Sequence, residues 1–369
     1  MKSQKKKLIL FPCLGNSVGG SHLSTITLLK KIKITGYDYL VLLINDGILE
    51  NILNENKIKY VKINIHIDRS FNNLFCLLGI IIVNFKKFYK VVKIYKPHAV
   101  HTNELYMHYI WSVICWVLKT PHIWHQHSAF YSRRNFIFSS FSSKILTVSK
   151  FCKQSFVNNM SKRAEVIYNP FDITKYQQNK INRNSLLKKI KLLPNKKTIS
   201  FFGSDNHQKG LNLFLEIIKE LDLKNKNKFN YLIVGKIKDK EKIFDLNLKG
   251  KITILSFNNF VKDLIQVSDI IIFPSNNEGF GRVLIEAMLL KTHFIASNSG
   301  SHKELVIHEQ NGFVSQKNSS KEYINLIANV LGNINNYKNV LNNAFKFAKL
   351  NFNDKKYIKE IKKHYDDLS

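Results

Sequence analysis

The feature that most constrains the fold is a regular alternation of short apolar runs with segments of helix length, repeated in both halves of the chain. The apolar runs of the first half are residues 8–15, 39–46, 99–103, 121–128 and 144–149. Those of the second half are residues 198–204, 230–235, 252–257, 269–275 and 293–298. Strands that alternate with helices form parallel sheets covered on both faces. Two such series therefore predict two doubly wound α/β domains, with ligand-binding loops at the carboxyl ends of the strands.

The length of 369 residues also fits two domains. A polar stretch at 171–197 lacks a strand pattern and marks the boundary between them. The tail from Tyr337 onward is rich in Lys and lacks a strand pattern too, which predicts helix. We expect an N-terminal domain at 1–172, a linker at 173–197, a C-terminal domain at 198–350 and a final helix at 351–369.

The charge balance is strongly basic, with 57 Lys and Arg against 26 Asp and Glu and a formal net charge of +31. Such an excess favours polyanionic partners: phosphorylated small molecules, acidic lipid or nucleic acid. The alternative is compositional drift, because the abundance of Lys, Asn and Ile is also the imprint of an AT-rich genome. Base edges are read mainly by bidentate Arg, and only six basic residues are Arg. The composition therefore argues against sequence-specific nucleic-acid binding.

Cysteine usage and hydropathy indicate a cytoplasmic protein that does not cross a bilayer. The N-terminal apolar run, Leu8 to Phe11, is too short for a signal peptide. The longest apolar run, Leu74 to Val83, has ten residues, about half of a membrane span. The cysteines are widely spaced without a C-x-x-C pair, which favours reduced thiols over zinc or disulfides. They are Cys13, Cys76, Cys115 and Cys152.

The strongest chemical signal is PSNNEGFGRVLIEAM at 274–288, which follows an apolar run. It predicts a buried strand, a Gly-containing turn, and a helix that begins near Arg282. A helix start carries unpaired N–H groups and a partial positive charge, so it favours anions. Glu278 before the helix and Glu286 within it can accept hydrogen bonds from sugar and ribose hydroxyls. The alternative is a capped surface helix with solvated glutamates.

Two further strand–Gly–helix junctions accompany this one. FFGSDNHQKGLN at 201–212 places Lys209 and Gly210 where a helix opens, a suitable position for a cation that faces a diphosphate. GNSVGGSH at 15–22 contains the adjacent Gly19 and Gly20. A single Gly pair is weak evidence, but three junctions at the carboxyl ends of strands predict one ligand cleft.

Taken together, these motifs resemble the retaining glycosyltransferases of family 4. EGFGRVLIE resembles the family's E-x7-E motif, and GSDNHQKG is similar to its KG segment. VIYNPFD at 166–172 and SNSGSHKELVIHEQNGFV at 297–314 resemble two further family segments. The resemblance covers essentially the whole chain. It implies the GT-B fold, with two Rossmann-like domains that face a central cleft, the N-terminal one for the acceptor and the C-terminal one for a nucleotide-sugar. The final helix would pack back toward the N-terminal domain.

The resemblance also implies site residues. Glu278 would contact the transferred sugar, Glu286 the ribose, and Lys209 the departing diphosphate. The remaining donor contacts would come from the backbone of Gly279, Phe280 and Gly281 and from Gly19 and Gly20. Where the family usually has Arg, this chain has Ser204, so one cationic phosphate contact is missing from the donor site. Arg282 is close enough in sequence to be a substitute.

The family places a histidine beside the sugar, at the end of an N-domain strand. PHIWHQHSAF offers His122, His125 and His127. Matching the family pattern favours His127, with His125 second; simple packing at a strand end remains the alternative for either. A H-x-H pair can also bind metal, but no third ligand is apparent, and the family needs no metal for chemistry.

The function that this resemblance implies is transfer of a sugar from a nucleotide-sugar, most simply a UDP-sugar, with retention of configuration and without a cofactor. The acceptor would be a glycan or a polyprenyl-diphosphate-linked intermediate of bacterial surface polysaccharide, such as capsule, O-antigen or lipopolysaccharide. Residues 71–96 combine an apolar run with lysines, which suits peripheral binding to an anionic membrane or simply a helix that covers the sheet. The alternative functions are a sugar-nucleotide epimerase or phosphorylase relative and a non-enzymatic basic nucleotide-binding protein.

Overall fold

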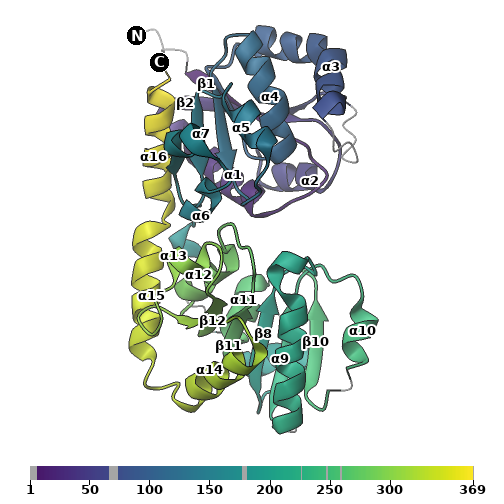
Figure 1. Cartoon of the computed structure of the whole chain (residues 1–369), viewed down its shortest axis with the longest axis vertical. Coiled ribbons are helices and arrows are strands. Elements are labelled where there is room, and N and C mark those ends of the chain that lie inside the picture. The colour runs from purple at the N-terminus through teal and green to yellow at the C-terminus, as the bar shows by residue number, and fades with distance from the viewer. Residues whose placement is uncertain are drawn as a thin grey trace. The chain divides into compact units, whose positions relative to one another are not determined.

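The computed structural model describes residues 6–65, 74–176, 181–225, 227–246, 248–257 and 260–368. The chain divides into two compact units (Figure 1). Unit 1 comprises residues 1–171 and 352–369, and unit 2 comprises residues 172–351. The start of the segment predicted as an amphipathic helix, residues 71–73, lies outside the described residues.

Unit 1 is built on a parallel sheet of seven strands in the order β3-β2-β1-β4-β5-β6-β7. The strands are β1 (Lys7–Cys13), β2 (Tyr37–Leu43), β3 (Tyr60–Lys62), β4 (Ala99–Thr102), β5 (His122–Gln126), β6 (Lys144–Thr147) and β7 (Ala164–Val166). The strand order reverses direction between β1 and β4. In doubly wound sheets, ligands bind outside the carboxyl ends of the strands at such a switch point.

Helices cover both faces of this sheet. They are α1 (Gly20–Lys31), η1 (Ile32–Thr35), α2 (Ile48–Glu55), α3 (Leu74–Tyr95), α4 (Leu105–Val117), α5 (Arg133–Ser139), α6 (Lys150–Lys153), α7 (Asn158–Arg163) and α16 (Asp354–Asp366). Successive residues of β1 point to opposite faces of the sheet. Ile9 packs into a core with α1 and α16, and Leu10 packs into one with α3 and α4. Such alternation buries both faces of a parallel strand.

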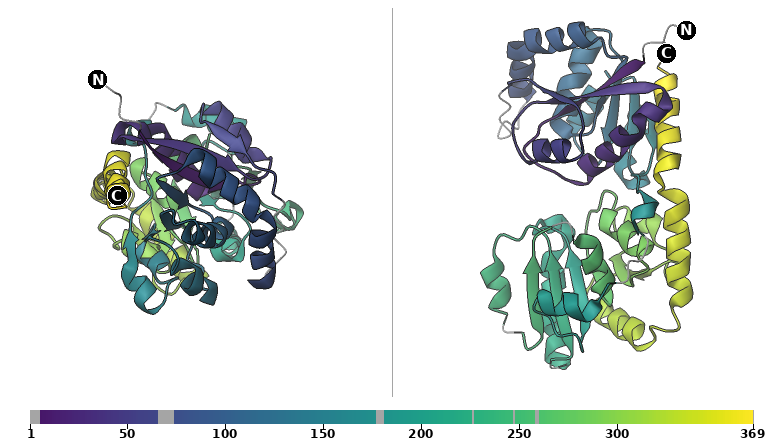
Figure 2. Two further views of the ribbon diagram at one scale, coloured as in Figure 1. Left: turned by 90° about the horizontal axis from the view of Figure 1, so that it is seen from above. Right: turned by 180° about the vertical axis from the view of Figure 1, so that it is seen from behind.

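The C-terminal helix α16 is part of unit 1. It packs beside α1, and Lys31 of α1 forms an ion pair with Asp354. The Tyr37 hydroxyl of β2 donates to Asp366 Oδ1 at 2.8 Å. Figure 2 shows this last helix alongside the sheet of unit 1.

Unit 2 has a parallel sheet of six strands in the order β10-β9-β8-β11-β12-β13. The strands are β8 (Lys197–Phe202), β9 (Phe229–Val234), β10 (Lys251–Leu255), β11 (Ile270–Phe273), β12 (Phe294–Ser297) and β13 (Phe313–Ser315). Here the strand order reverses between β8 and β11, which gives unit 2 its own switch point.

The helices of unit 2 are η2 (Ile173–Tyr176), α8 (Arg183–Lys189), η3 (His207–Lys209), α9 (Leu211–Lys224), α10 (Lys240–Phe244), α11 (Val261–Val267), α12 (Arg282–Leu289), α13 (His302–Leu305), α14 (Ser320–Gly332) and α15 (Lys338–Asn351). One face of the sheet packs against α9 and α14 around Phe201, Phe214 and Tyr323. Helices α12 and α15 pack against each other.

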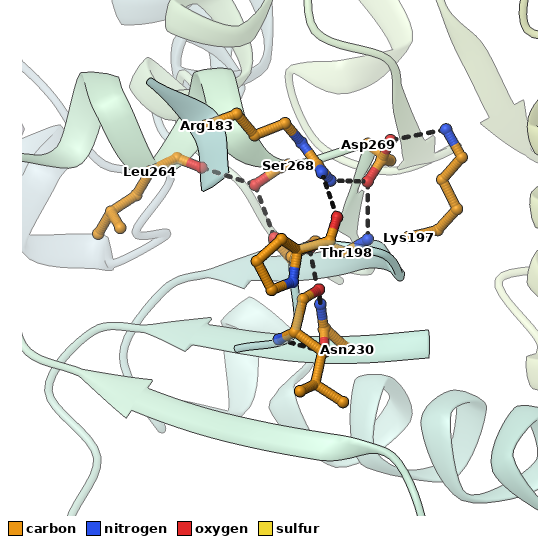
Figure 3. A network of polar contacts seen from close by, with 10 residues as sticks. Arg183, Lys197, Thr198, Asn230, Leu264, Ser268 and Asp269 are labelled. Carbon is orange, nitrogen blue, oxygen red and sulfur yellow. Dashed lines mark hydrogen bonds and ion pairs between the residues drawn. The ribbon is translucent and has the colours of Figure 1, made fainter. Parts of the chain in front are cut away.

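The segment at 173–197 was expected to be a linker, and the structure assigns it to unit 2, with η2 and α8. Its attachment is a polar network at the amino ends of β8 and β11 (Figure 3). Arg183 Nη2 lies 2.6 Å from Asp269 Oδ2, and Lys197 Nζ lies 3.0 Å from Asp269 Oδ1. Asn230 exchanges two hydrogen bonds with the backbone of Leu193. This end of the sheet is opposite to the switch-point loops, so the network has a structural role.

The predicted alternation of strands and helices is confirmed for all ten apolar runs, which form β1, β2, β4 to β6 and β8 to β12. Three strands were missed: β3, β7 and β13. Each has three residues, which is too short for the alternation of side chains to be recognised. Among the described residues, no helix is both long and apolar enough to span a membrane.

Candidate active site

Three turns of unit 2 meet at the carboxyl ends of adjacent strands: residues 203–210 after β8, 274–281 after β11, and 298–302 after β12. The Asn276 amide donates to Gln208 O at 2.9 Å and joins the first two turns. The Ser301 amide donates to Glu278 O at 2.9 Å and joins the second turn to the third. The structure therefore brings Lys209 and Glu278 together, although 69 residues separate them in the sequence.

Glycines make this close packing possible. Gly210 has φ +76°, and a Cβ there would lie 2.1 Å from Pro274 O. Gly300 has φ +58°, and a Cβ there would lie 2.6 Å from the backbone N and O of Glu278. Both glycines combine a left-handed backbone with an approach that only a residue without a side chain permits.

Glu278 and Lys209 form an ion pair. Lys209 Nζ lies 2.6 Å from Glu278 Oε2, and the two side chains are 35% and 14% exposed respectively. Burial raises the pKa of Glu278, but Lys209, His302 and the Gly281 amide together outweigh burial, so the pKa is lowered overall. Glu278 is therefore an ionised acceptor at neutral pH, next to a cation.

His302 is a neighbour of this pair that the sequence analysis did not single out. It begins α13, and a Cβ at Gly281 would lie 3.4 Å from its Nε2. Its Nδ1 lies 3.2 Å from Ser297 Oγ. Burial lowers the pKa of His302 to about 4, although Glu278 acts in the opposite direction. His302 is consequently neutral at physiological pH. Its place at the end of the turn that follows β12, in SHKEL, was the signal available in the sequence.

Glu286, the second predicted carboxylate, lies inside α12 and has a different partner. The Tyr176 hydroxyl of η2 donates to Glu286 Oε1 at 3.1 Å. Burial raises the pKa of Glu286, while Arg282, the Tyr176 hydroxyl and Lys262 act in the opposite direction. Tyr176 is 8% exposed and was not predicted from the sequence.

The other predicted residues of unit 2 lie in the same turns. Gly281 is the N-cap of α12 with φ +77°, and Phe280 before it is buried. Gly279 lies between Phe280 and Glu278, in the turn before α12. Ser204 lies in the turn after β8, between Gly203 and Asp205. Arg282, considered as a substitute for the Arg missing at 204, acts electrostatically on Glu286 and Tyr176.

In unit 1, the Gly-rich turn precedes α1 at the carboxyl end of β1. Gly19 is the N-cap of α1 and Gly20 its first residue, and neither has positive φ. The Gly19 amide donates to His22 Nδ1 at 3.1 Å. His22 Nε2 in turn lies 3.0 Å from Glu104 Oε1, and Glu104 also accepts from the Leu14 amide at 3.2 Å. His22 and Glu104 thus tie this turn to the end of β4; neither residue was singled out from the sequence, although Glu104 follows the predicted strand at 99–103.

His127 follows β5 in unit 1, where the sequence places it. Its Nε2 lies 3.0 Å from Asn103 Oδ1, and its ring lies 4.5 Å from that of His125. Burial lowers the pKa of His127 below its usual range, with His125 acting in the same direction. His127 is therefore neutral. Its Nδ1 is buried and has no hydrogen-bond partner among the described residues.

The two other histidines of PHIWHQHSAF are more deeply placed. His125 Nδ1 lies 3.2 Å from His101 Nε2, and His101 Nδ1 lies 2.8 Å from the Tyr365 hydroxyl. His122 is fully buried against Ser142. Burial lowers the pKa of both His122 and His125 to about 3. Within the part of the chain that the structure describes, no group of three or more His, Cys, Asp or Glu residues could hold a metal ion.

Comparison with known families matches both units. The family model described as "Glycosyltransferase Family 4" matches residues 18–175, and the one described as "Glycosyl transferases group 1" matches residues 182–347. An uncharacterised glycosyltransferase of Methanocaldococcus jannaschii is 28% identical over 62% of this chain and 60% of its own length. An Escherichia coli UDP-Gal:α-D-GlcNAc-diphosphoundecaprenol α-1,3-galactosyltransferase is 26% identical over 58% of this chain and 57% of its own length. The chain thus matches about three fifths of each of these two relatives.

Among solved structures, the Anabaena protein HepE in complex with UDP-glucose aligns with a TM-score of 0.82. The alignment has 20% sequence identity and covers 98% of this chain and 99% of that one. This similarity shows the fold, and the two family models cover most of the sequence. The chain therefore belongs to the group 1 and family 4 glycosyltransferases, which have the GT-B fold.

Proposed function

We propose that the protein is a retaining glycosyltransferase that moves a sugar from a nucleotide-sugar, most simply a UDP-sugar, to a glycan or lipid-linked acceptor in bacterial surface polysaccharide synthesis. The single observation that carries the proposal is the meeting of three turns at the switch point of unit 2, with Lys209 and Glu278 in contact. A cation, an ionised acceptor and the N-terminus of α12 are the groups that a sugar diphosphate requires.

In this proposal, unit 2 binds the donor. Lys209 and the amides of Gly279, Phe280 and Gly281 stabilise the negative charge that develops on the diphosphate as the glycosidic bond breaks. Glu278 accepts a hydrogen bond from a hydroxyl of the transferred sugar, and Glu286 accepts from the ribose. Ser204 contributes a neutral hydroxyl to the phosphates. The charge on the diphosphate is met by protein groups, so we propose that the reaction requires neither a metal ion nor a cofactor.

Unit 1 contributes the acceptor side. His127 is neutral, and because Asn103 Oδ1 is an acceptor, His127 Nε2 carries the proton. Its Nδ1 is then a lone pair that can accept from a substrate hydroxyl. Gly19 and Gly20 leave the approach to the α1 N-terminus open, since both are exposed. Attack by the acceptor hydroxyl on the face from which the diphosphate leaves, with the acceptor proton passing to a phosphate oxygen, would retain the configuration.

The relatives support this choice of substrates. HepE was solved with UDP-glucose, and the Escherichia coli relative is named for UDP-galactose and a diphosphoundecaprenol-linked acceptor. We extend both to this chain as a UDP-sugar donor and a polyprenyl-diphosphate-linked acceptor. An acceptor of that kind lies in a membrane, so we also propose a cytoplasmic protein that binds peripherally to an anionic membrane.

Helix α3 is the surface that supports membrane binding. Its first half exposes Phe75, Ile82 and Val83, which are 82%, 72% and 81% exposed. Its second half exposes four lysines, Lys96 directly after the helix is also exposed, and the sequence has no acidic residue between Asp68 and Glu104. The four in the helix are Lys86, Lys87, Lys90 and Lys93. Exposed apolar side chains beside lysines suit the interface of an anionic bilayer.

Donor binding is tested by thermal shift with UDP-, GDP-, ADP- and TDP-sugars, because a ligand of the native state raises the melting temperature. Nucleotide release from the donor that binds is then measured in the presence of a lipid extract. Glu278→Gln should abolish release, whereas Glu322→Gln, which alters a hydrogen-bonded carboxylate in α14, should leave it intact. Full release from Glu278→Gln would refute the site.

Membrane binding is tested by sedimentation with vesicles of phosphatidylcholine and phosphatidylglycerol. We expect binding at low salt that weakens as salt rises, because lysine contacts are screened. Ile82→Glu should reduce it, and Leu223→Glu, at an equally exposed position of α9 in unit 2, should not. Absence of sedimentation at low salt, or equal loss in both variants, would contradict the proposed surface.

A further inference from the structure

Tyr176 is the residue from which we draw a further inference. It ends η2, the first element of unit 2, and reaches Glu286 in α12, 110 residues later. Its hydroxyl donates to Glu286 Oε1 at 3.1 Å, and its side chain is almost fully buried. A carboxylate has about four lone-pair positions. One tyrosine bond therefore fixes the orientation of Glu286 and leaves most of its acceptor capacity for a ligand.

The charge state of Glu286 depends on the same neighbours. Burial raises its pKa, which favours the neutral acid, and Arg282, Tyr176 and Lys262 act against burial. An acid that carries its own proton is a weaker acceptor for two hydroxyls than a carboxylate is. A donor at Oε1 thus supports the form of Glu286 that binds a diol.

Lys262 of α11 also contacts Tyr176, through the face of the aromatic ring. Its Nζ lies 4.9 Å from the centroid of the Tyr176 ring and donates to Lys175 O at 3.0 Å. A cation over the ring is attracted to its face and restricts the movement of the side chain. Three elements, η2, α11 and α12, therefore converge on Glu286.

We propose that Tyr176 is a positioning residue that orients the Glu286 carboxylate toward the ribose diol of the donor nucleotide. This inference rests on the proposed function, because it assumes that Glu286 faces the ribose. It adds that the preference for a ribonucleotide over a 2′-deoxyribonucleotide depends on a residue at the start of unit 2.

The test is calorimetric titration of the full-length chain with UDP and with 2′-deoxy-UDP, with the GDP and ADP pairs titrated alongside. The wild type should bind the ribonucleotide about tenfold or more tightly than the deoxynucleotide, since a hydrogen bond to a charged group is worth about 1.5–3 kcal/mol. Tyr176→Phe should bind the ribonucleotide about five- to tenfold more weakly and lose most of the preference. As the pH is lowered, the affinity of Tyr176→Phe for the ribonucleotide should begin to fall at a higher pH than the affinity of the wild type does.

Tyr231→Phe is the matched control. Tyr231 donates to Asp222 Oδ1 at 3.3 Å, so the variant also removes a buried tyrosine–carboxylate bond of unit 2, away from Glu286. It should keep the affinity and the preference of the wild type. Lys262→Met, which removes the cation but keeps the hydroxyl, provides a second variant, and it should weaken the preference in the same direction by less.

The outcomes separate this inference from the proposed function. If the wild type binds no ribonucleoside diphosphate, both are overturned. If the wild type binds and Tyr176→Phe and Lys262→Met both keep its affinity and ribose preference, only the role of Tyr176 is overturned. Equal losses in Tyr176→Phe and Tyr231→Phe would also overturn it, because they would indicate a general effect on the fold of unit 2.

Discussion

Lys209 and Glu278 form an ion pair whose two members are unequally exposed, so removing one should cost more stability than removing the other. Lys209→Met leaves the carboxylate of Glu278, which is only 14% exposed, without its cation. Glu278→Gln leaves Lys209, which is 35% exposed and can turn to water. Both replacements are close in size to the native side chain, so packing changes little.

The difference can be sized from burial. An unsatisfied buried polar group costs about 1–3 kcal/mol, and a charged one costs more, but the Gly281 amide still donates to Glu278 and compensates part of this. An exposed ion pair contributes only about 0–1 kcal/mol, which bounds the cost of Glu278→Gln. We therefore expect Lys209→Met to lower the free energy of unfolding of unit 2 by about 1–2 kcal/mol more than Glu278→Gln does.

The pH dependence gives an internal check. The pKa of Glu278 is lowered in the native state, so its contribution to stability is present above the unfolded pKa and is lost as pH falls through the lowered native value. In Lys209→Met, burial is less opposed and the pKa of Glu278 rises. The difference in free energy of unfolding between Lys209→Met and Glu278→Gln should consequently become smaller at acidic pH, where Glu278 in Lys209→Met takes up a proton.

The assay is urea unfolding followed by hydrogen exchange of peptides that span 270–305, because those peptides report on the turns of unit 2 directly. Measurements at pH 7.5 and pH 4.5 give the two ends of the comparison. Equal costs at pH 7.5, or a larger cost for Glu278→Gln, would refute the reasoning from burial.

Two further predictions concern the frame of the site. Gly210→Ala should destabilise unit 2 by about 2 kcal/mol or more, since it combines positive φ with a contact to Pro274 O. Gly19→Ala is the control: nothing lies within 4 Å of its Cβ, so the free energy of unfolding should change by no more than about 0.5 kcal/mol. Equal melting temperatures of the two variants in calorimetry would contradict this. Burial lowers the pKa of His122 and of His125 to about 3 in the fold, against about 6.5 in the unfolded chain. The unfolded state therefore binds more protons below pH 6.5. As pH falls below that value, the free energy of unfolding of unit 1 should decrease by about 1.4 kcal/mol per histidine per pH unit. All three tryptophans, at 111, 116 and 124, lie in unit 1, so their fluorescence melts at pH 7.5 and pH 5 should differ clearly, and identical melts would contradict it.

The fold could be predicted because local pattern determines it. The strand runs IIIF at 270–273 and YLIV at 231–234 are apolar throughout, and that is the signature of a parallel strand buried on both faces. The three-residue strands β3, β7 and β13 carry no such pattern, because their pairing depends on the neighbouring strand rather than on their own sequence. The segment at 173–197 looked like a linker for a similar reason: its attachment depends on Asp269, which lies 86 residues after Arg183.

The position of a candidate residue in the fold could be predicted only where it follows a strand in a recognisable motif. Glu278, Glu286, Lys209 and His127 lie in such motifs, and their roles stay predictions. The sequence could not show the hydrogen-bond partners of the candidate residues. Glu286 accepts from the Tyr176 hydroxyl, and the Gly19 amide donates to His22. These contacts join residues from separate elements, and the packing of the sheet determines them. Tyr176 and His22 therefore required the structure.

In the proposed function, the turns around Lys209 bind the diphosphate of a nucleotide-sugar. Calorimetric titration of UDP into the wild type, Lys209→Met and Lys219→Met tests it most directly, because Lys219 is an exposed lysine of α9 and controls for net charge. We expect the wild type and Lys219→Met to bind UDP equally. Lys209→Met should bind UDP at least about tenfold more weakly, since a charge-assisted bond is worth about 1.5–3 kcal/mol. Equal affinity of all three proteins for UDP would contradict it.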